Sequence, residues 1–235
     1  MDKQALRERV WDALEDSGEA RFPYPPHGRI PNFAGAETAA DRLTELDAWQ
    51  EAEAIKSNPD APQLPVRRAA LDEGKTVYMA VPRLRDENCF LRLDPAEIQD
   101  TDSAATIGGS SEHGVQVGPE EMEAIDLIVS GSVAVTRDGA RVGKGEGYSD
   151  LEFAILREFG LVDDGTTTVS TVHGMQVVDE EIPADAHDVP IEWLCAPEHC
   201  IEAGTGQRKP AGIEWASLPE EKIAEIPILQ RLRPE

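Results

Sequence analysis

The chain has 235 residues, and its 46 acidic and 22 basic side chains give a formal net charge of −24 at pH 7. This charge argues against nonspecific nucleic-acid binding, which needs clustered cations to neutralise phosphates. No apolar run approaches the roughly 20 residues that cross a bilayer, so a transmembrane helix is not expected either.

The basic residues are unevenly divided, because only 6 are lysines and 16 are arginines. Few lysines, many carboxylates and retained arginines are typical of proteins in molar salt, where a Debye length of about 3 Å screens surface repulsion. We therefore expect a halophilic, haloarchaeal origin. The N-terminal sequence MDKQALRERVW has no apolar signal region, and three cysteines are too few for a disulfide framework, so we expect a cytoplasmic protein.

The first part of the chain is predicted to combine short helices, proline-rich loops and strands. The spacing of four between Leu6, Val10 and Leu14 is typical of an amphipathic helix. Prolines and glycines make the segments between helices irregular. In chain order we expect a helix at 2–16, an irregular segment at 21–35, a helix at 36–54, a loop at 56–65, a helix at 66–74, and strands at 75–81 and 90–93.

The second part alternates strands and helices more regularly. In chain order we expect a polar loop at 94–119, a strand at 125–135, a glycine-rich loop, a helix at 148–160, strands at 166–172 and 189–196, and a helix near 219–225. The near-continuous apolar run IDLIVSGSVAV predicts a strand buried on both faces. This alternation predicts an α/β fold of three αβα layers, with a mostly parallel open sheet and helices on both faces. We expect one domain over 1–204 and a C-terminal extension over 205–235.

The stretch RVGKGEGYSD (141–150) places three alternating glycines directly before a predicted helix. Glycines let backbone N–H groups approach an anion, and a helix N-terminus favours a phosphate. Arg141 and Lys144 add positive charge, and Asp150 could hold Mg²⁺. The alternative is a tight strand-to-helix connection with Asp150 as the N-cap. The combination favours a nucleotide phosphate site, although the spacing matches neither GxxxxGK[ST] nor GxGxxG.

RVGKGEGYSD resembles the RxGxGxGYYD signature of the 5-formyltetrahydrofolate cyclo-ligase family, also called methenyltetrahydrofolate synthetases. KQALR near the N-terminus is similar to the family's KxxLR motif. SNPDAPQ, RIPNF and GKGEGYSD look most like the divergent branch of methenyltetrahydrofolate synthetase domain-containing proteins. The resemblance implies a cytoplasmic ligase of one-carbon metabolism that uses ATP and Mg²⁺ to convert 5-formyltetrahydrofolate into 5,10-methenyltetrahydrofolate, with release of ADP and phosphate.

The resemblance also implies which residues bind ATP. Those that match the family's nucleotide-binding motifs are Lys3, Arg7, Arg141, Gly143, Lys144, Gly145, Gly147 and Tyr148. Arg141 and Lys144 are the implied catalytic residues, because cations neutralise the charge that builds up on a transferring phosphoryl group.

The resemblance further implies that Asp150 and Asp188 bind the metal. The family's folate-contacting glutamate has no counterpart here, and Asp60 or Gln63 is the candidate substitute. The expected partners are a small-molecule folate and ATP, without nucleic acid or membrane, and the oligomeric state stays open. Two alternatives also stay open: a nucleotide-binding module of this fold that is non-catalytic or acts on another substrate, and a sugar-phosphate or CoA-type enzyme on a related sheet.

The charge analysis predicts that salt stabilises this protein. Raising KCl from low concentration to 2 M should raise the melting temperature, because salt screens repulsion among the surface carboxylates. A melting series in KCl measures the effect, and no gain in stability across that range would count against a halophilic origin.

Overall fold

The structure is a computed structural model that describes residues 2–204 and 206–234, and within them the main sheet has eight strands. In sheet order these are β13 (Cys200–Glu202), β12 (Trp193–Cys195), β10 (Thr167–Thr171), β7 (Leu127–Val129), β3 (Ala54–Ser57), β4 (Thr76–Ala80), β5 (Phe90–Leu93) and β6 (Val115–Val117). The strands from β12 to β4 are parallel, and β13, β5 and β6 add antiparallel edges. The predicted mostly parallel sheet is therefore confirmed.

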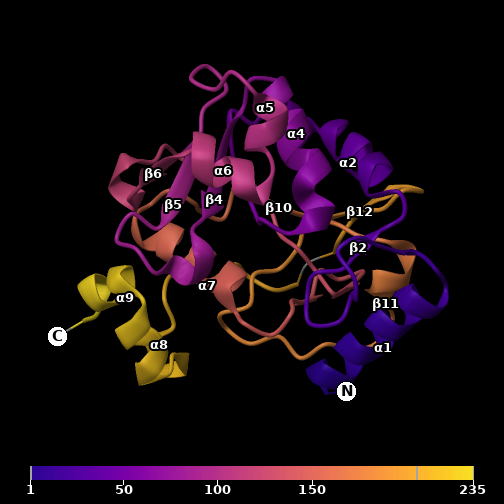
Figure 1. The fold of residues 1–235 in the computed structure, drawn as a ribbon. Helices are drawn as coiled ribbons and strands as arrows, with labels where there is room; N and C mark the ends of the chain where they lie inside the picture. The colour runs from indigo at the N-terminus through magenta and orange to yellow at the C-terminus, as the bar shows by residue number, and fades with distance from the viewer. Residues whose placement is uncertain (1, 205, 235) are drawn as a thin grey trace.

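Helices cover both faces of this sheet, as predicted (Figure 1). They are α1 (Lys3–Asp16), α2 (Ala36–Thr44), α3 (Asp47–Glu51), α4 (Leu64–Asp72), α5 (Thr101–Ala104), α6 (Ile107–His113), α7 (Tyr148–Glu158), α8 (Glu220–Glu225) and α9 (Pro227–Leu232). In β7, Leu127 and Val129 belong to the core cluster that includes α2 and α4, and Ile128 belongs to the cluster that includes α7. Alternate side chains of β7 are thus buried on opposite faces. None of the described helices is long and apolar enough to span a bilayer.

The apolar run at 125–135 forms two strands in two sheets, so the expectation of one strand is wrong. The chain leaves the main sheet after β7, and β8 (Ala134–Thr136) joins β9 (Arg141–Val142) and β11 (Val177–Val178) in a small sheet. Val133 and Ala134 pack there with α1. Both halves of the run are buried, so hydrophobicity alone does not reveal where the chain changes sheets. A further short pair, β1 (Ala20–Arg21) and β2 (Asn32–Phe33), lies beside α1 in the same core.

Strand β3, next to β7 in the middle of the sheet, is absent from the sequence-based expectation. Its four residues, AIKS, span the end of the helix expected at 36–54 and the start of the loop expected at 56–65. The helix instead breaks into α2 and α3. A strand this short that carries a lysine has no recognisable period, and Lys56 is buried only because a carboxylate from α7 faces it.

Two further expectations need correction. The segment 94–119 is not a plain loop, because it contains α5, α6 and the edge strand β6. Cys195 and Cys200 form a disulfide across the β12–β13 pair, although the sequence suggested no disulfide framework. The strand expected at 189–196 is reduced to β12. The other expected elements, at 2–16, 66–74, 75–81, 90–93, 148–160, 166–172 and near 219–225, are confirmed within a few residues.

The C-terminal segment packs onto the same core as the rest of the chain. Ile223, Ile226 and Leu229 are buried in the cluster that contains the apolar side of α7. Figure 1 shows α8 and α9 on the α7 side of the sheet. Of the extension expected over 205–235, residues 205 and 235 lie outside the described part.

A buried ion pair joins β3 to α7. Lys56 Nζ contacts a carboxylate oxygen of Glu152, and the exposed fractions of their side chains are 1% and 6%. Asn58 Nδ2 also donates to this carboxylate, at 3.4 Å. Removing one partner of such a pair leaves an uncompensated buried charge, whereas replacing both with apolar groups is often tolerated.

We predict that Lys56→Met lowers the free energy of unfolding by about 3–5 kcal/mol, because Glu152 is then buried without its cation. The double variant Lys56→Met with Glu152→Leu should recover most of this loss. Urea unfolding of both variants measures the difference. Equal destabilisation by the single and double variants would contradict a role for the charge pairing.

Candidate functional site

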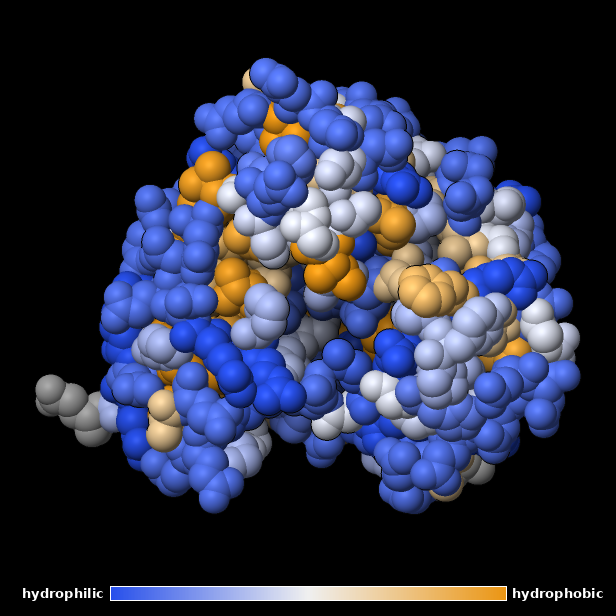
Figure 2. Space-filling view, in the orientation of Figure 1, coloured by the Kyte–Doolittle hydropathy of each residue, from blue (hydrophilic) through white to orange (hydrophobic). Residues whose placement is uncertain are grey.

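A cleft of about 530 Å³ opens where the main sheet, α1 and the loop before α7 meet. Its lining includes Asn58, Val81 and Gly131, which follow β3, β4 and β7. The carboxyl ends of neighbouring parallel strands are where open α/β sheets bind ligands. Figure 2 shows the hollow at the centre of this face, with hydrophobic side chains around its upper rim and hydrophilic ones below.

The three glycines of the loop between β9 and α7 differ in their surroundings and backbone conformation. A Cβ on Gly143 would lie 3.0 Å from Arg141 Nη1, too close for an ordinary contact. Gly145 and Gly147 have φ angles of +107° and +66°, a region that other residues rarely adopt. All three line the cleft, as expected from the sequence.

The backbone of this loop offers free hydrogen-bond donors. Within the described residues, no backbone N–H from 144 to 150 donates to a protein acceptor, and the first helical bond at this end runs from Leu151 N to Gly147 O, at 3.3 Å. These amides belong to the loop and to the first turn of α7, where the helix dipole favours an anion. The arrangement suits a phosphate group better than a simple turn.

Three cations surround these amides, all of them predicted from the sequence. Lys3, Arg7 and Lys144 line the cleft, together with Tyr148. Arg7 Nε donates to Gly143 O at 2.7 Å and so ties α1 to the loop. Burial opposes the charge of Lys144, but its hydrogen bond to Glu146 and nearby carboxylates outweigh this effect and raise its pKa. Lys144 is therefore charged at neutral pH.

Arg141 is held by the protein beneath the loop. Its Nη1 donates to Gly131 O at 2.9 Å, and its Nη2 donates to Asp150 Oδ2 at 2.6 Å. Asp150 Oδ1 accepts from Val189 N at 3.1 Å. Burial opposes both charges, but the ion pair outweighs it, so the pKa of Asp150 is lowered and that of Arg141 is raised. Arg141 thus positions the loop as well as lining the cleft.

The two carboxylates expected to bind Mg²⁺ both face the cleft, and each already pairs with a cation of the protein. Asp150 pairs with Arg141, and Asp188 Oδ2 accepts from Lys3 Nζ at 3.0 Å. Asp185 also pairs with Lys3, at 3.4 Å. Carboxylates are suitable ligands for Mg²⁺, but a bound ion would have to displace or share these cation partners. Metal binding at Asp150 and Asp188 stays a prediction.

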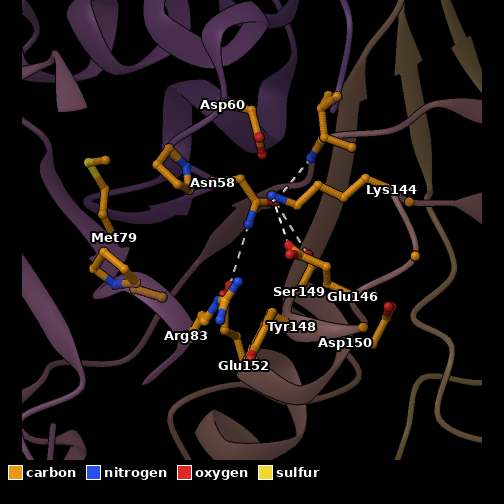
Figure 3. A pocket seen from close by; sticks show the side chains of 18 of the residues that line it. Asn58, Asp60, Met79, Arg83, Lys144, Glu146, Tyr148, Ser149, Asp150 and Glu152 are labelled. Carbon is orange, nitrogen blue, oxygen red and sulfur yellow. Dashed lines mark hydrogen bonds and ion pairs between the residues drawn. The ribbon is translucent and has the colours of Figure 1, made fainter. Parts of the chain in front are cut away.

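Polar residues that the sequence did not single out line the other half of the cleft. Asn58 Oδ1 accepts from Gly131 N at 3.0 Å and from Ser149 Oγ at 3.3 Å. Figure 3 shows Asn58 between Ser149 and Glu152, with Lys144 reaching toward it from the glycine loop. The sequence does contain a sign that Glu152 has a special environment, because it is a lone acid within the apolar stretch LEFAIL of the predicted helix. Only its partner Lys56, far away in sequence, explains its burial.

The structure separates the two candidate folate-contacting residues. Asp60 lines the cleft, and no hydrogen bond to its side chain is found within the described residues. Gln63 is buried outside the cleft and donates to Thr171 Oγ1 at 3.4 Å. The structure therefore favours Asp60 over Gln63, whose side chain lies between η1 (Ala61–Gln63) and β10, and substrate binding by either residue stays a prediction.

A sequence model of the 5-formyltetrahydrofolate cyclo-ligase family matches residues 1–197. The chain is 42% identical over 237 residues to a mouse methenyltetrahydrofolate synthase domain-containing protein, covering 99% of this chain and 63% of the relative. The human protein of that name is 38% identical, with coverages of 99% and 62%. The chain thus spans just over three-fifths of these relatives.

Comparison with solved structures supports the fold. The NMR structure of 5,10-methenyltetrahydrofolate synthetase from Aquifex aeolicus aligns with a TM-score of 0.54 and 20% identity, covering 88% of this chain and 95% of that one. The match of the family model over residues 1–197 shows that the chain belongs to the 5-formyltetrahydrofolate cyclo-ligase family.

Proposed function

We propose that this chain is an ATP-dependent 5-formyltetrahydrofolate cyclo-ligase that forms 5,10-methenyltetrahydrofolate, ADP and phosphate. One observation about the cleft carries the proposal. One half of the cleft is lined by free amides of the glycine loop and by three cations, and the other half is lined by Asn58, Asp60 and apolar residues. The first half suits a polyphosphate and the second suits a flat heterocycle with donor groups. The membership of the family supplies the reaction.

In the family's reaction the formyl oxygen receives the terminal phosphoryl group of ATP, N10 attacks the formyl carbon, and phosphate leaves as the ring closes. The residues needed are those that position the substrates and neutralise charge. Lys144 extends from the glycine loop toward Asn58 and Asp60, between the two halves of the cleft (Figure 3). We assign it to the charge of the transferring group. Arg7 and Arg141 hold the loop in place.

We assign Asp60 to the folate. A carboxylate can accept two hydrogen bonds from adjacent N–H donors, such as those of a pterin ring. Arg67, which is buried, donates to the backbone oxygens of Asn58, Pro59 and Asp60 and so fixes this loop. Burial raises the pKa of Asp60, against the opposing effects of Lys144 and Arg67. This half-buried carboxylate has no hydrogen-bond partner among the described residues, so it can accept hydrogen bonds from a ligand.

The proposal is tested by incubating the protein with ATP, Mg²⁺ and 5-formyltetrahydrofolate in concentrated KCl and following the absorbance of the methenyl product. Product formation that requires ATP supports the cyclo-ligase. Calorimetric binding of ATP without turnover would favour the alternative, a module of the same fold that is non-catalytic or acts on another substrate.

We predict that Lys144→Met raises the Kd for ATP about tenfold, or about 1.4 kcal/mol, because a charge-assisted contact is lost. Arg137→Met is the matched control, since it removes one positive charge from an exposed position shortly before the same loop. Calorimetry with both variants measures the effect. An unchanged Kd in Lys144→Met, or an equal rise in the control, would remove Lys144 from the nucleotide site.

We also predict that Asp60→Asn stabilises the free protein while it impairs folate turnover. Because the folded-state pKa of Asp60 is raised, the ionised carboxylate destabilises the fold at pH 7, and this penalty disappears as the pH falls toward the unfolded value of about 3.9. We therefore expect a higher Tm at pH 7, and this gain should shrink at lower pH.

Thermal melts in a pH series measure this gain. Asp86→Asn, at an exposed position, makes the same change in charge and should leave Tm nearly unchanged. A loss of stability in Asp60→Asn, or full folate turnover, would contradict the assignment of Asp60.

A further inference from the structure

The C-terminal segment, which lies beyond the match to the family at residue 197, reaches the glycine loop. Helix α8 is anchored by Ile223, which is buried in the same core as α7. Figure 1 shows α8 (yellow) and α1 (indigo) on opposite sides of the region that leads into α7. The two terminal helices therefore approach the loop from different directions.

Lys222 is the residue of α8 that touches this loop. Its Nζ donates to Glu146 O at 2.9 Å and lies 4.6 Å from the centre of the Tyr148 ring. A Cβ added to Gly147 would lie 3.6 Å from the same atom. Burial lowers the pKa of Lys222, and Asp150 and Glu146 oppose this shift. One ammonium group thus contacts Glu146 and Tyr148 of the predicted phosphate loop and lies beside Gly147 between them.

The hydrogen bond to Glu146 fixes the direction of a neighbouring donor. In a planar trans peptide, the N–H of Gly147 points opposite to the carbonyl of Glu146. Lys222 is not among the described residues that line the cleft, whereas Gly147 is. The carbonyl therefore turns toward α8, outside the cleft, and the Gly147 N–H is presented on the other side of the peptide.

The distribution of lysines supports a specific task for Lys222. The chain has only six lysines against 46 acids. Lys3 and Lys144 line the cleft, Lys56 pairs with the cleft residue Glu152, and Lys222 contacts the loop. The remaining two, Lys75 and Lys209, donate to backbone oxygens elsewhere. Four of the six thus gather at one site in a strongly acidic protein.

We propose that Lys222 is a positioning residue of the nucleotide site, which holds the Glu146–Tyr148 part of the glycine loop so that its amides face the polyphosphate. In this proposal the C-terminal segment contributes to nucleotide binding by holding the loop. This inference rests on the proposed function in one respect, namely that the cleft binds ATP. The ligand class concerned is a nucleoside triphosphate, recognised through its phosphates.

The test compares Lys222→Met with Arg231→Met in the full chain. Arg231 is a cation of the same C-terminal segment, it lies 5.6 Å from the ring of Phe159 at the other end of α7, and it pairs with Glu120. Both substitutions remove one charge and one cation–π contact, but only Lys222→Met frees the loop. Melting curves of both variants report how well the segment stays packed.

Calorimetry with ATP, with a non-hydrolysable ATP analogue and with inorganic triphosphate gives the Kd values. We expect Lys222→Met to raise each Kd about tenfold, through loss of a charge-assisted hydrogen bond and a cation–π contact. Hydrogen exchange of the Leu151 amide, which donates to Gly147 O in the loop, should become faster in the ligand-free variant. Lys222→Arg should restore most of the affinity, because arginine can also donate to Glu146 and stack on Tyr148. Arg231→Met should change the Kd less than twofold, because this residue does not touch the loop. That change is smaller than the one expected from the loss of a contact that supports polyphosphate binding.

Three outcomes would overturn the inference. Unchanged affinity and unchanged exchange in Lys222→Met, with ATP still bound by the unmodified protein, would show that the contact positions nothing. An equal loss of affinity in Arg231→Met would assign the effect to general packing of the segment. Absence of ATP binding by the unmodified protein would overturn the proposed function together with this inference, and that result is distinct from the other two.

Discussion

The ion pair between Arg141 and Asp150 is the interaction on which the candidate site depends. The guanidinium of Arg141 donates hydrogen bonds to Gly131, which follows the central strand β7, and to Asp150 in the first turn of α7. Asp150 in turn accepts a hydrogen bond from Val189. The pair is buried, so its charges are poorly screened by salt. A glycine at 143 leaves room for the pair, because a Cβ there would lie only 3.0 Å from Arg141 Nη1. Loop sequence, loop shape and helix position are thus coupled through one buried arginine.

The site concentrates positive charge in a protein that is otherwise strongly acidic. Cations from α1, from the glycine loop and from α8 converge on one short stretch of backbone, although these elements are far apart in sequence. The described lining of the cleft holds five cations and five carboxylates, so it is close to neutral in a protein whose net charge is −24, and the cations beside the loop reduce the repulsion that an anionic ligand meets there. The cleft also keeps costly features, such as the poorly partnered Asp60 and the positive φ of 58° at Arg83, which is typical of functional sites.

The fold shows where sequence patterns are informative and where they are not. Helices α1 and α7 and strands β4, β5 and β10 follow from hydrophobic periodicity, because each buries one regular face or a continuous apolar run. Strand β3 escaped prediction because it has four residues and its central lysine is acceptable only opposite Glu152. The run at 125–135 has the pattern of one strand, because burial in two different cores leaves the same apolar signature.

The sequence by itself determined the α/β class, the glycine loop with its lysine and tyrosine, and the basic residues of the first helix. These features are local, since spacing along the chain fixes which groups lie together. Only the tertiary structure decided that Asn58 and Glu152 share the cleft, that Gln63 lies outside it, and that Lys222 reaches the loop from the C-terminal segment. Those contacts join residues up to 108 positions apart, as between Gln63 and Thr171. Pairings over such separations depend on how strands and helices pack, which no local pattern encodes.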